Sequence, residues 1–108
     1  MISLSVKLRN GRLIEILTAK GHAGMMRESG DPVCAAVSAF IGTLILYLKS
    51  RPEWQSAVKT PERGHIVLTV GEIPENDRKS WENVCEFFLL GVRSIADEYP
   101  KALDLRYL

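Results

Sequence analysis

The sequence predicts an α+β fold, a two-layer sandwich in which a mainly antiparallel sheet of about five strands carries two helices on one face. The predicted order is ββαββαβ, and three patterns support it. Alternating apolar and polar residues predict strands, the dipeptide Asn10-Gly11 predicts a tight turn between the first two strands, and two long stretches with apolar residues every three or four positions predict helices. A chain of 108 residues fits a single compact domain, over residues 1–108.

The first two strands are predicted to form a hairpin. Apolar residues alternate with Ser, Lys and Arg over residues 2–8, which gives that strand one buried and one wet face. Asn10-Gly11 suits a type I′ turn, because both central residues of that turn need positive φ, so residues 12–20 should return as the second strand. Apolar residues of the second strand point both ways, with Ile14 opposite to Leu17, so both faces should be partly covered.

The first helix is predicted to begin at Asp31-Pro32. Aspartate at the N-cap accepts a hydrogen bond from an early helix amide, and proline at the first helical position removes no amide that the helix needs. The helix should run to about Ser50, apolar nearly all round and packed on more than one side. Its apolar run is shorter than the roughly 20 residues of a membrane span and contains Ser38 and Thr43, which favours a buried helix over a membrane segment.

The second half of the chain predicts another hairpin and another helix. Residues 54–58 suggest a short irregular strand, residues 60–64 a turn, and residues 66–70 a regular strand. Asn76 should cap the second helix, which should stop at Pro100.

The second helix is amphipathic and is followed by a last strand over residues 103–107. Gly42 and Gly91 lie inside the two predicted helices, where glycine is less favourable than alanine by about 1 kcal/mol, so each should allow a close backbone approach. The apolar stripe of the second helix comprises Trp81, Val84, Cys85, Phe88, Val92, Ile95 and Tyr99.

The composition, the N-terminal segment and the spacing of cysteines and histidines limit which partners, which cellular compartment and which cofactors are expected. The formal net charge of +1 predicts no basic surface for a nucleic acid. The N-terminus has no charged leader followed by an apolar run, so we expect no secretory signal, no membrane association and a cytoplasmic protein. The two cysteines and two histidines lack the close ligand spacing of structural zinc sites, and no glycine-rich phosphate loop is present, so we expect no metal and no cofactor.

For one of the two cysteines and one of the two histidines, the sequence predicts a structural role and not a catalytic one. Cys85 falls in the apolar stripe of the second helix and should be a core residue, whereas His65 falls opposite the apolar face of its strand and should be exposed. A reducing cytoplasm should keep Cys34 and Cys85 as free thiols, although the sequence leaves a bridge between them open.

The chemistry of the chain centres on the segment before the first helix. This segment contains Gly21, Gly24 and Gly30 without apolar periodicity, which predicts a mobile surface loop. His22 stands at one end of the loop, and Cys34 stands beyond the other end, at the third position of the helix. A helix N-terminus favours a thiolate, and its amides can donate to the oxyanion that forms when sulfur attacks a peptide carbonyl. His22 could serve as general base and then as general acid.

Each of these residues also has a structural interpretation. Cysteine is among the most buried residue types, so Cys34 is also explained as a small core residue. Asp31 could orient His22 as a third catalytic member, but its place at the helix start favours an N-cap. Ser38 lies one turn after Cys34 on the same helix face, where it either supports the site or bonds to its own backbone.

Two segments, His22-Ala23-Gly24 and Asp31-Pro32-Val33-Cys34-Ala35-Ala36-Val37-Ser38-Ala39, resemble the ribosomal-processing cysteine protease family known as Prp. Length and predicted element order agree along essentially the whole chain. The resemblance implies that His22 and Cys34 form a catalytic dyad, which Asp31 and Ser38 support. It also implies a homodimeric bacterial protease that removes a short N-terminal extension from the twenty-seventh large-subunit ribosomal protein.

The chain departs from the family pattern around the aspartate. The family often has a glycine two positions before it and an aliphatic residue after it, whereas this chain has Ser29 and Pro32, and Pro32 should stiffen the junction between loop and helix. The sequence therefore predicts a thiol endopeptidase in which Cys34 attacks the scissile carbonyl and His22 transfers the proton. The alternative is a non-enzymatic module that binds a ribosomal protein or ribosomal RNA, with Cys34 only packed.

Overall fold

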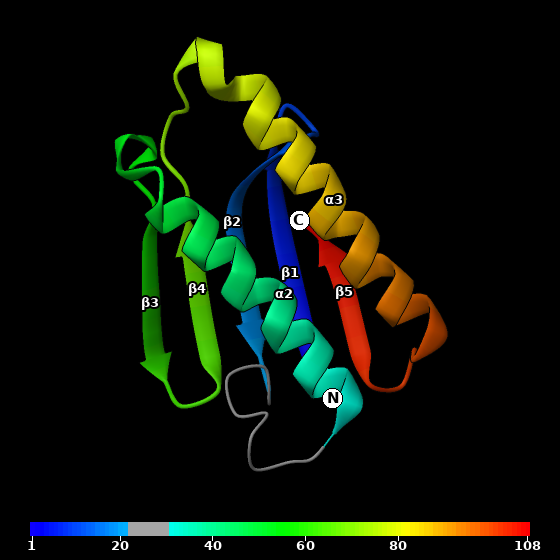
Figure 1. The fold of residues 1–108 in the computed structure, drawn as a ribbon. Coiled ribbons are helices and arrows are strands. Elements are labelled where there is room, and N and C mark those ends of the chain that lie inside the picture. Colours follow the sequence, from blue (N-terminus) through cyan, green and yellow to red (C-terminus); the bar gives the residue numbers. More distant parts are fainter. Residues whose placement is uncertain (22–30) are drawn as a thin grey trace.

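The computed structural model describes residues 1–21 and 31–108 of the chain. In chain order its elements are β1 (Ile2–Arg9), β2 (Leu13–Lys20), α2 (Pro32–Lys49), the 3₁₀ turn η1 (Pro52–Trp54), β3 (Ala57–Glu62), β4 (His65–Thr69), the 3₁₀ turn η2 (Glu75–Asp77), α3 (Arg78–Glu98) and β5 (Leu103–Tyr107). The five strands form one sheet in the order β3-β4-β2-β1-β5, and α2 and α3 lie on the same face of it (Figure 1). β5 is parallel to β1 and the other pairs are antiparallel, so the predicted α+β sandwich is confirmed.

The β1–β2 hairpin turns as predicted but contains an unpredicted bulge. Asn10 and Gly11 have φ of 55° and 69°, the positive values that the predicted turn requires. Between Lys7 and the next residue of β1 the register shifts, so that Glu15 of β2 has no partner across the hairpin. The extra residue reverses which face of the sheet each neighbouring side chain of β2 points to. The side chain of Ile14 lies in the core and is 1% exposed. The expectation that Ile14 points away from the main core is therefore wrong.

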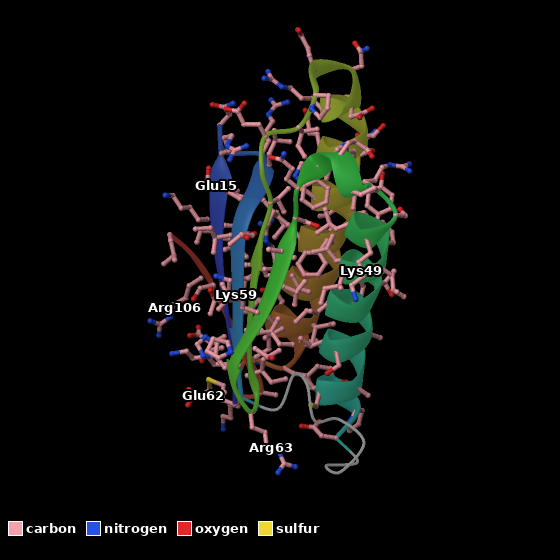
Figure 2. All side chains as sticks on the ribbon, turned by 90° about the vertical axis from the view of Figure 1, so that its left-hand side faces the viewer. Glu15, Lys49, Lys59, Glu62, Arg63 and Arg106 are labelled. Atoms are coloured by element: carbon pink, nitrogen blue, oxygen red, sulfur yellow. The ribbon has the colours of Figure 1, made fainter. Side chains whose placement is uncertain are left out.

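The face of the sheet away from the helices carries charged side chains, among them Glu15, Lys59 and Arg106 (Figure 2). Glu15 accepts a hydrogen bond from Arg9 Nε at 2.9 Å, and its other carboxylate oxygen lies 3.5 Å from Lys7 Nζ. The hydrogen bond from Arg9 lowers the pKa of the Glu15 carboxyl. The bulge therefore places an ion-paired carboxylate on the open face instead of an apolar side chain.

Helix α2 begins where the sequence predicts but buries only one face. Its buried side chains recur every three or four positions, while Ala35 and Ala39 are exposed and Leu46 is 68% exposed. Within one copy of the chain the expectation of packing on more than one side is wrong, because the buried side chains lie along a single face of the helix. By length and composition α2 could also cross a membrane, and a third of it is buried within the fold. The buried residues are Val33, Cys34, Val37, Ile41, Leu44 and Leu48.

Two residues between α2 and α3 lie in elements other than those predicted for them. Trp54 lies in η1 rather than in a strand, and its buried ring donates a hydrogen bond from Nε1 to Asp77 Oδ2 at 3.0 Å. Asn76 lies inside η2 and is not the cap, because α3 begins at Arg78 after Asp77. The predicted second hairpin is confirmed, although its first strand continues to Glu62, where a turn was expected.

The two helical glycines differ in their surroundings. A Cβ at Gly91 of α3 would lie 2.4 Å from ring atoms of Phe40 on α2, so this glycine lets the ring pack onto the α3 backbone, as predicted. Nothing lies within 4 Å of a Cβ at Gly42, so that prediction is wrong. The predicted stripe of α3 supplies the core with Trp81, Cys85, Phe88 and Val92, and Leu89 joins them.

Candidate active site

One end of the sheet gathers the residues that flank the predicted catalytic segment (Figure 1). β1 and β5 begin there, β2 ends there, and β4 begins beside it, because Ile2 pairs with Leu103 and Lys20 pairs with His65. The first turn of α2 lies at the same end (Figure 1). We call this end, with Ile2, Lys20, Gly21, His65 and Leu103, the foot of the sheet.

Gly21 holds the end of β2 in a position that needs glycine. Its N–H donates to the Gly64 carbonyl at 3.0 Å, and its φ is +110°. A Cβ there would lie 2.7 Å from the Met1 carbonyl oxygen, so a side chain is excluded both by the backbone angle and by the start of β1. The sequence predicted Gly64 only as the end of a turn, because its contact with Gly21 depends on strand pairing.

The next residue, His22, lies outside the described part of the chain, together with Gly24 and Gly30. The predicted approach of His22 to Cys34 and the predicted mobile loop therefore remain predictions.

Cys34, which forms no disulfide with Cys85, lies at the third helical position of α2 and is 0% exposed. Asp31 forms the predicted N-cap, since its Oδ1 accepts the Val33 N–H at 2.9 Å, and its carbonyl accepts the Ala35 N–H at 3.0 Å. The cap fixes the first turn of α2 and therefore the position of the sulfur. Because the thiol is fully covered, a peptide carbonyl can reach it only after neighbouring side chains move.

The helix start offers fewer oxyanion donors than the sequence suggested. Pro32 has no N–H, and the Val33 N–H already bonds to the Asp31 side chain. These two positions therefore add no amide to an oxyanion site, which needs donors about 3 Å from the oxyanion.

Ser38 lies one turn after Cys34 on α2 and is half-buried. His65 differs from its prediction, because its side chain is only 17% exposed instead of open to solvent. Its Nδ1 lies 3.7 Å from Glu62 Oε1 at the end of the β3–β4 turn. The structure thus brings the second histidine to the foot, where the sequence had suggested only surface.

Cys85 has the structural surroundings that the sequence predicted. It is 0% exposed, and its Sγ accepts the Ile14 N–H at 3.3 Å. Burial raises the pKa of the Cys85 thiol to about 12. A thiol with this pKa is protonated at neutral pH and is a poor nucleophile.

Within residues 1–21 and 31–108, no three side chains from His, Cys, Asp and Glu come together as a metal ion would require. In the described part of the chain, the foot of the sheet contains a thiol, a capped helix start and polar backbone groups. These groups are suited to covalent chemistry at sulfur.

Comparison with known proteins agrees with this fold and chemistry. The model of a protein family described as cysteine protease Prp matches residues 1–104. The ribosomal processing protease Prp of Staphylococcus aureus, solved with a covalently linked product peptide, has a TM-score of 0.79 at 17% identity, with both chains fully covered. The same protease with a substrate peptide has a TM-score of 0.77 at 16% identity, again over the whole of both chains.

A third solved structure, SMU.848 from Streptococcus mutans, has a TM-score of 0.79 at 24% identity and covers all of this chain and 94% of its own. No curated protein matches the chain. At these identities the solved structures establish a shared fold, and the match to the family model over residues 1–104 establishes the family. The chain belongs to the Prp family of cysteine proteases.

Proposed function

We propose that this protease is a cytoplasmic endopeptidase that removes a short N-terminal extension from a bacterial ribosomal protein, the twenty-seventh of the large subunit. The position of Cys34 carries the proposal: the thiol lies in the capped first turn of α2, at the foot where β2 leads into His22. The S. aureus relative is a ribosomal processing protease with a covalently linked product peptide, which supports the same substrate class and covalent chemistry here.

In the proposed mechanism Cys34 and His22 act as a dyad. His22 takes the thiol proton, and the sulfur attacks the scissile carbonyl carbon while the carbonyl electrons move to oxygen. The N-terminus of α2 stabilises the negative charge of this oxyanion. The intermediate then collapses, the C–N bond breaks, and His22 gives its proton to the leaving amine. Water activated by His22 hydrolyses the thioester and restores the thiol.

Asp31 and Ser38 have supporting roles in this proposal. The Asp31 side chain is engaged by the Val33 amide, so we assign it to positioning the helix start and not to orienting His22. Ser38 lies on the same face of α2 as Cys34, one turn deeper, where its hydroxyl can hydrogen-bond within the site. Gly21 fixes the strand end that precedes His22.

A peptide-cleavage assay tests the dyad, because the chain contains a matched control for each member. The probe is a peptide that copies the extended N-terminus of the ribosomal protein, followed by mass spectrometry to locate the cut. Cys34→Ala and His22→Ala should lower kcat/KM at least about a thousandfold. Cys85→Ala and His65→Ala should stay within a few-fold of the wild type. Cleavage that survives Cys34→Ala would refute the proposal.

The alternative, a binding module with a packed Cys34, predicts different results. The wild type should not cleave the peptide, and Cys34→Ala should lower the folding stability, because packing in the core would then be the only role of Cys34. Membership of a cysteine protease family favours the enzyme.

We further propose that a second copy of this chain covers the outer face of the helices. Phe87 and Leu90 of α3 are 72% and 58% exposed, and Leu46 of α2 is 68% exposed. A hollow of about 120 Å³ between the two helices is lined by Phe40, Tyr47, Phe87 and other side chains that are almost all apolar. Exposed apolar surface of this kind usually marks an interface.

Sedimentation velocity at micromolar concentration tests the dimer. The wild type should sediment as a dimer, and Phe87→Lys should sediment as a monomer because a charge would be buried in the contact. Val58→Lys, which changes an exposed apolar residue on β3, serves as the control and should remain dimeric. A wild type that is monomeric would contradict this part of the proposal.

A further inference from the structure

Among the residues that the structure describes, no strand pairs with the outer edge of β5. β5 is the last strand in the sheet order and is parallel to β1. The Ala102 carbonyl accepts from the first residue of β1 at 2.9 Å, and the Leu108 N–H donates to β1 at 2.8 Å, so the even-numbered residues face β1. The N–H and C=O of Leu105 and Tyr107 therefore point to the open edge.

The other edge strand, β3, is poorly suited to accept a partner. Pro61 lies within it and has no N–H to donate, and Lys59 precedes a break in its register with β4. Proline, lysine and bulges are the features by which proteins protect an edge from pairing. β5 contains neither a proline nor a register break. Of the two edges, β5 is thus the one open to strand addition.

A hollow of about 370 Å³ lies along β5 where α3 passes over it. The β5 side is lined by Leu103, Asp104, Leu105 and Tyr107, and the α3 side by Arg93, Ala96 and Asp97. Its volume is within the range of small-ligand pockets, about 300–1,000 Å³. In an added strand, alternate side chains would point toward this hollow.

The edge and the hollow both begin at the foot of the sheet. Leu103 pairs with Ile2, and a Cβ on Gly21 would lie 3.2 Å from the Cα of Ile2. One strand therefore separates the start of β5 from the residue that precedes His22. A chain paired with β5 would reach the foot, where Cys34 lies, without a change of direction.

We propose that the extended peptide substrate adds to the open edge of β5 as a sixth strand and turns alternate side chains toward the hollow beneath α3. The main chain of the peptide bonds to Leu105 and Tyr107, and the hollow, which has both apolar and charged lining residues, receives one of the alternate side chains. The Arg106 side chain, which pairs with Asp104 at 2.7 Å, lies on the face of the sheet away from the helices (Figure 2), whereas Asp104 also lines the hollow. This inference rests on the proposed peptide substrate and specifies how the enzyme holds it.

An N-methyl scan of the substrate peptide tests strand addition with the wild-type enzyme. Methylation removes one main-chain donor at a time, and in a strand only alternate amides face the partner. We expect kcat/KM to fall about tenfold at every second position of the paired segment and to change little at the positions between. A uniform effect, or none, would overturn the inference.

A proline substitution tests the edge from the protein side. Leu105→Pro removes the outward N–H, which an edge strand tolerates. Arg106→Ala, on the face of β5 away from the helices, keeps every outward N–H and serves as the control. Leu105→Pro should lower kcat/KM about tenfold through KM, with little change for Arg106→Ala and a folded state for both by thermal unfolding. If Leu105→Pro does not fold, the N-methyl scan decides. If the Leu105→Pro substitution instead converts a dimer to a monomer and leaves kcat/KM unchanged, a second copy occupies the edge and the inference is wrong.

Amide exchange separates failure of this inference from failure of the proposed activity. The full-length Cys34→Ala variant with excess substrate peptide should show slower exchange at Leu105 and Tyr107 only, because the even-numbered amides of β5 already bond to β1. Protection without cleavage by the wild type would refute the protease and keep the docking edge. Cleavage by the wild type without protection would refute the docking edge and keep the protease.

Discussion

Cys34 and Cys85 are both 0% exposed and form no disulfide with each other, yet their surroundings differ. Cys85 lies in the middle of α3, where its sulfur accepts the Ile14 amide and burial raises its pKa to about 12. Cys34 lies in the first turn of α2, where the helix dipole favours negative charge and the strand end before His22 is near. The two thiols are therefore equally buried, and their positions along the helices separate the proposed nucleophile Cys34 from the core residue Cys85.

Alkylation should separate the two thiols by the largest factor. With iodoacetamide at pH 7, Cys34 should react at least about a hundredfold faster than Cys85 in the folded protein, because a pKa of about 12 leaves almost no Cys85 thiolate. Mass spectrometry of proteolytic fragments measures both rates in one sample. Equal labelling of the two cysteines would remove the distinction between them.

The Cys85 thiol should also make folding stability depend on pH in the alkaline range. Its pKa rises from 9.0 to about 12 in the folded protein, so the folded state holds the proton more tightly than the unfolded state. The resulting stability is fully present below pH 9 and is lost at up to about 1.4 kcal/mol per pH unit between pH 9 and 12.

Urea unfolding across this range measures the effect as a difference between wild type and Cys85→Ala, which cancels the titration of lysines and tyrosines. The wild type should lose its advantage as the pH rises, and the variant should be the less stable at neutral pH because the Ile14 amide loses its acceptor. A constant difference between the two proteins would show that the thiol is not held in its protonated form.

Local patterns in the sequence predicted most of the fold and one part of the site. Alternation predicted β1, Asn10-Gly11 predicted the turn, and Asp31-Pro32 predicted the cap that positions Cys34. Each of these depends on neighbouring residues and on the sterics or hydrogen bonds of a single segment, which is why a single sequence is enough to recognise them.

The features that were missed depend on contacts between distant segments. The bulge at Glu15 is defined by the register with β1, and Ile14 joins the core only because of that register. Trp54 is buried because η1 brings its ring beside Asp77 and Trp81, although its own neighbours in sequence suggest a strand. The half-buried His65 reaches the foot through pairing with Lys20. No local pattern encodes these pairings.

Gly21→Ala should affect the foot more than the core. The Cβ would lie 2.7 Å from the Met1 carbonyl, at a φ of +110°, so we expect a loss of about 1–3 kcal/mol in the free energy of unfolding. Because Gly21 precedes His22, kcat/KM should fall as well. Gly42→Ala is the matched control: nothing lies near its Cβ, and alanine should stabilise α2 by up to about 1 kcal/mol. Urea unfolding and the peptide assay measure both changes, and equal behaviour of the two variants would contradict the assignment.

The smallest expected change is at the Asp31 cap, and it tests whether position at the helix start matters for Cys34. Asp31→Ala leaves the Val33 N–H without its side-chain acceptor and should cost about 1 kcal/mol of stability. Asp31→Asn retains a capping oxygen, so it should restore both stability and kcat/KM. If Asp31→Asn is stable but remains inactive, the carboxylate itself acts in the reaction, and a role in orienting His22 replaces the capping role. Recovery of both properties would instead mean that Cys34 depends on Asp31 only through the geometry of the first turn.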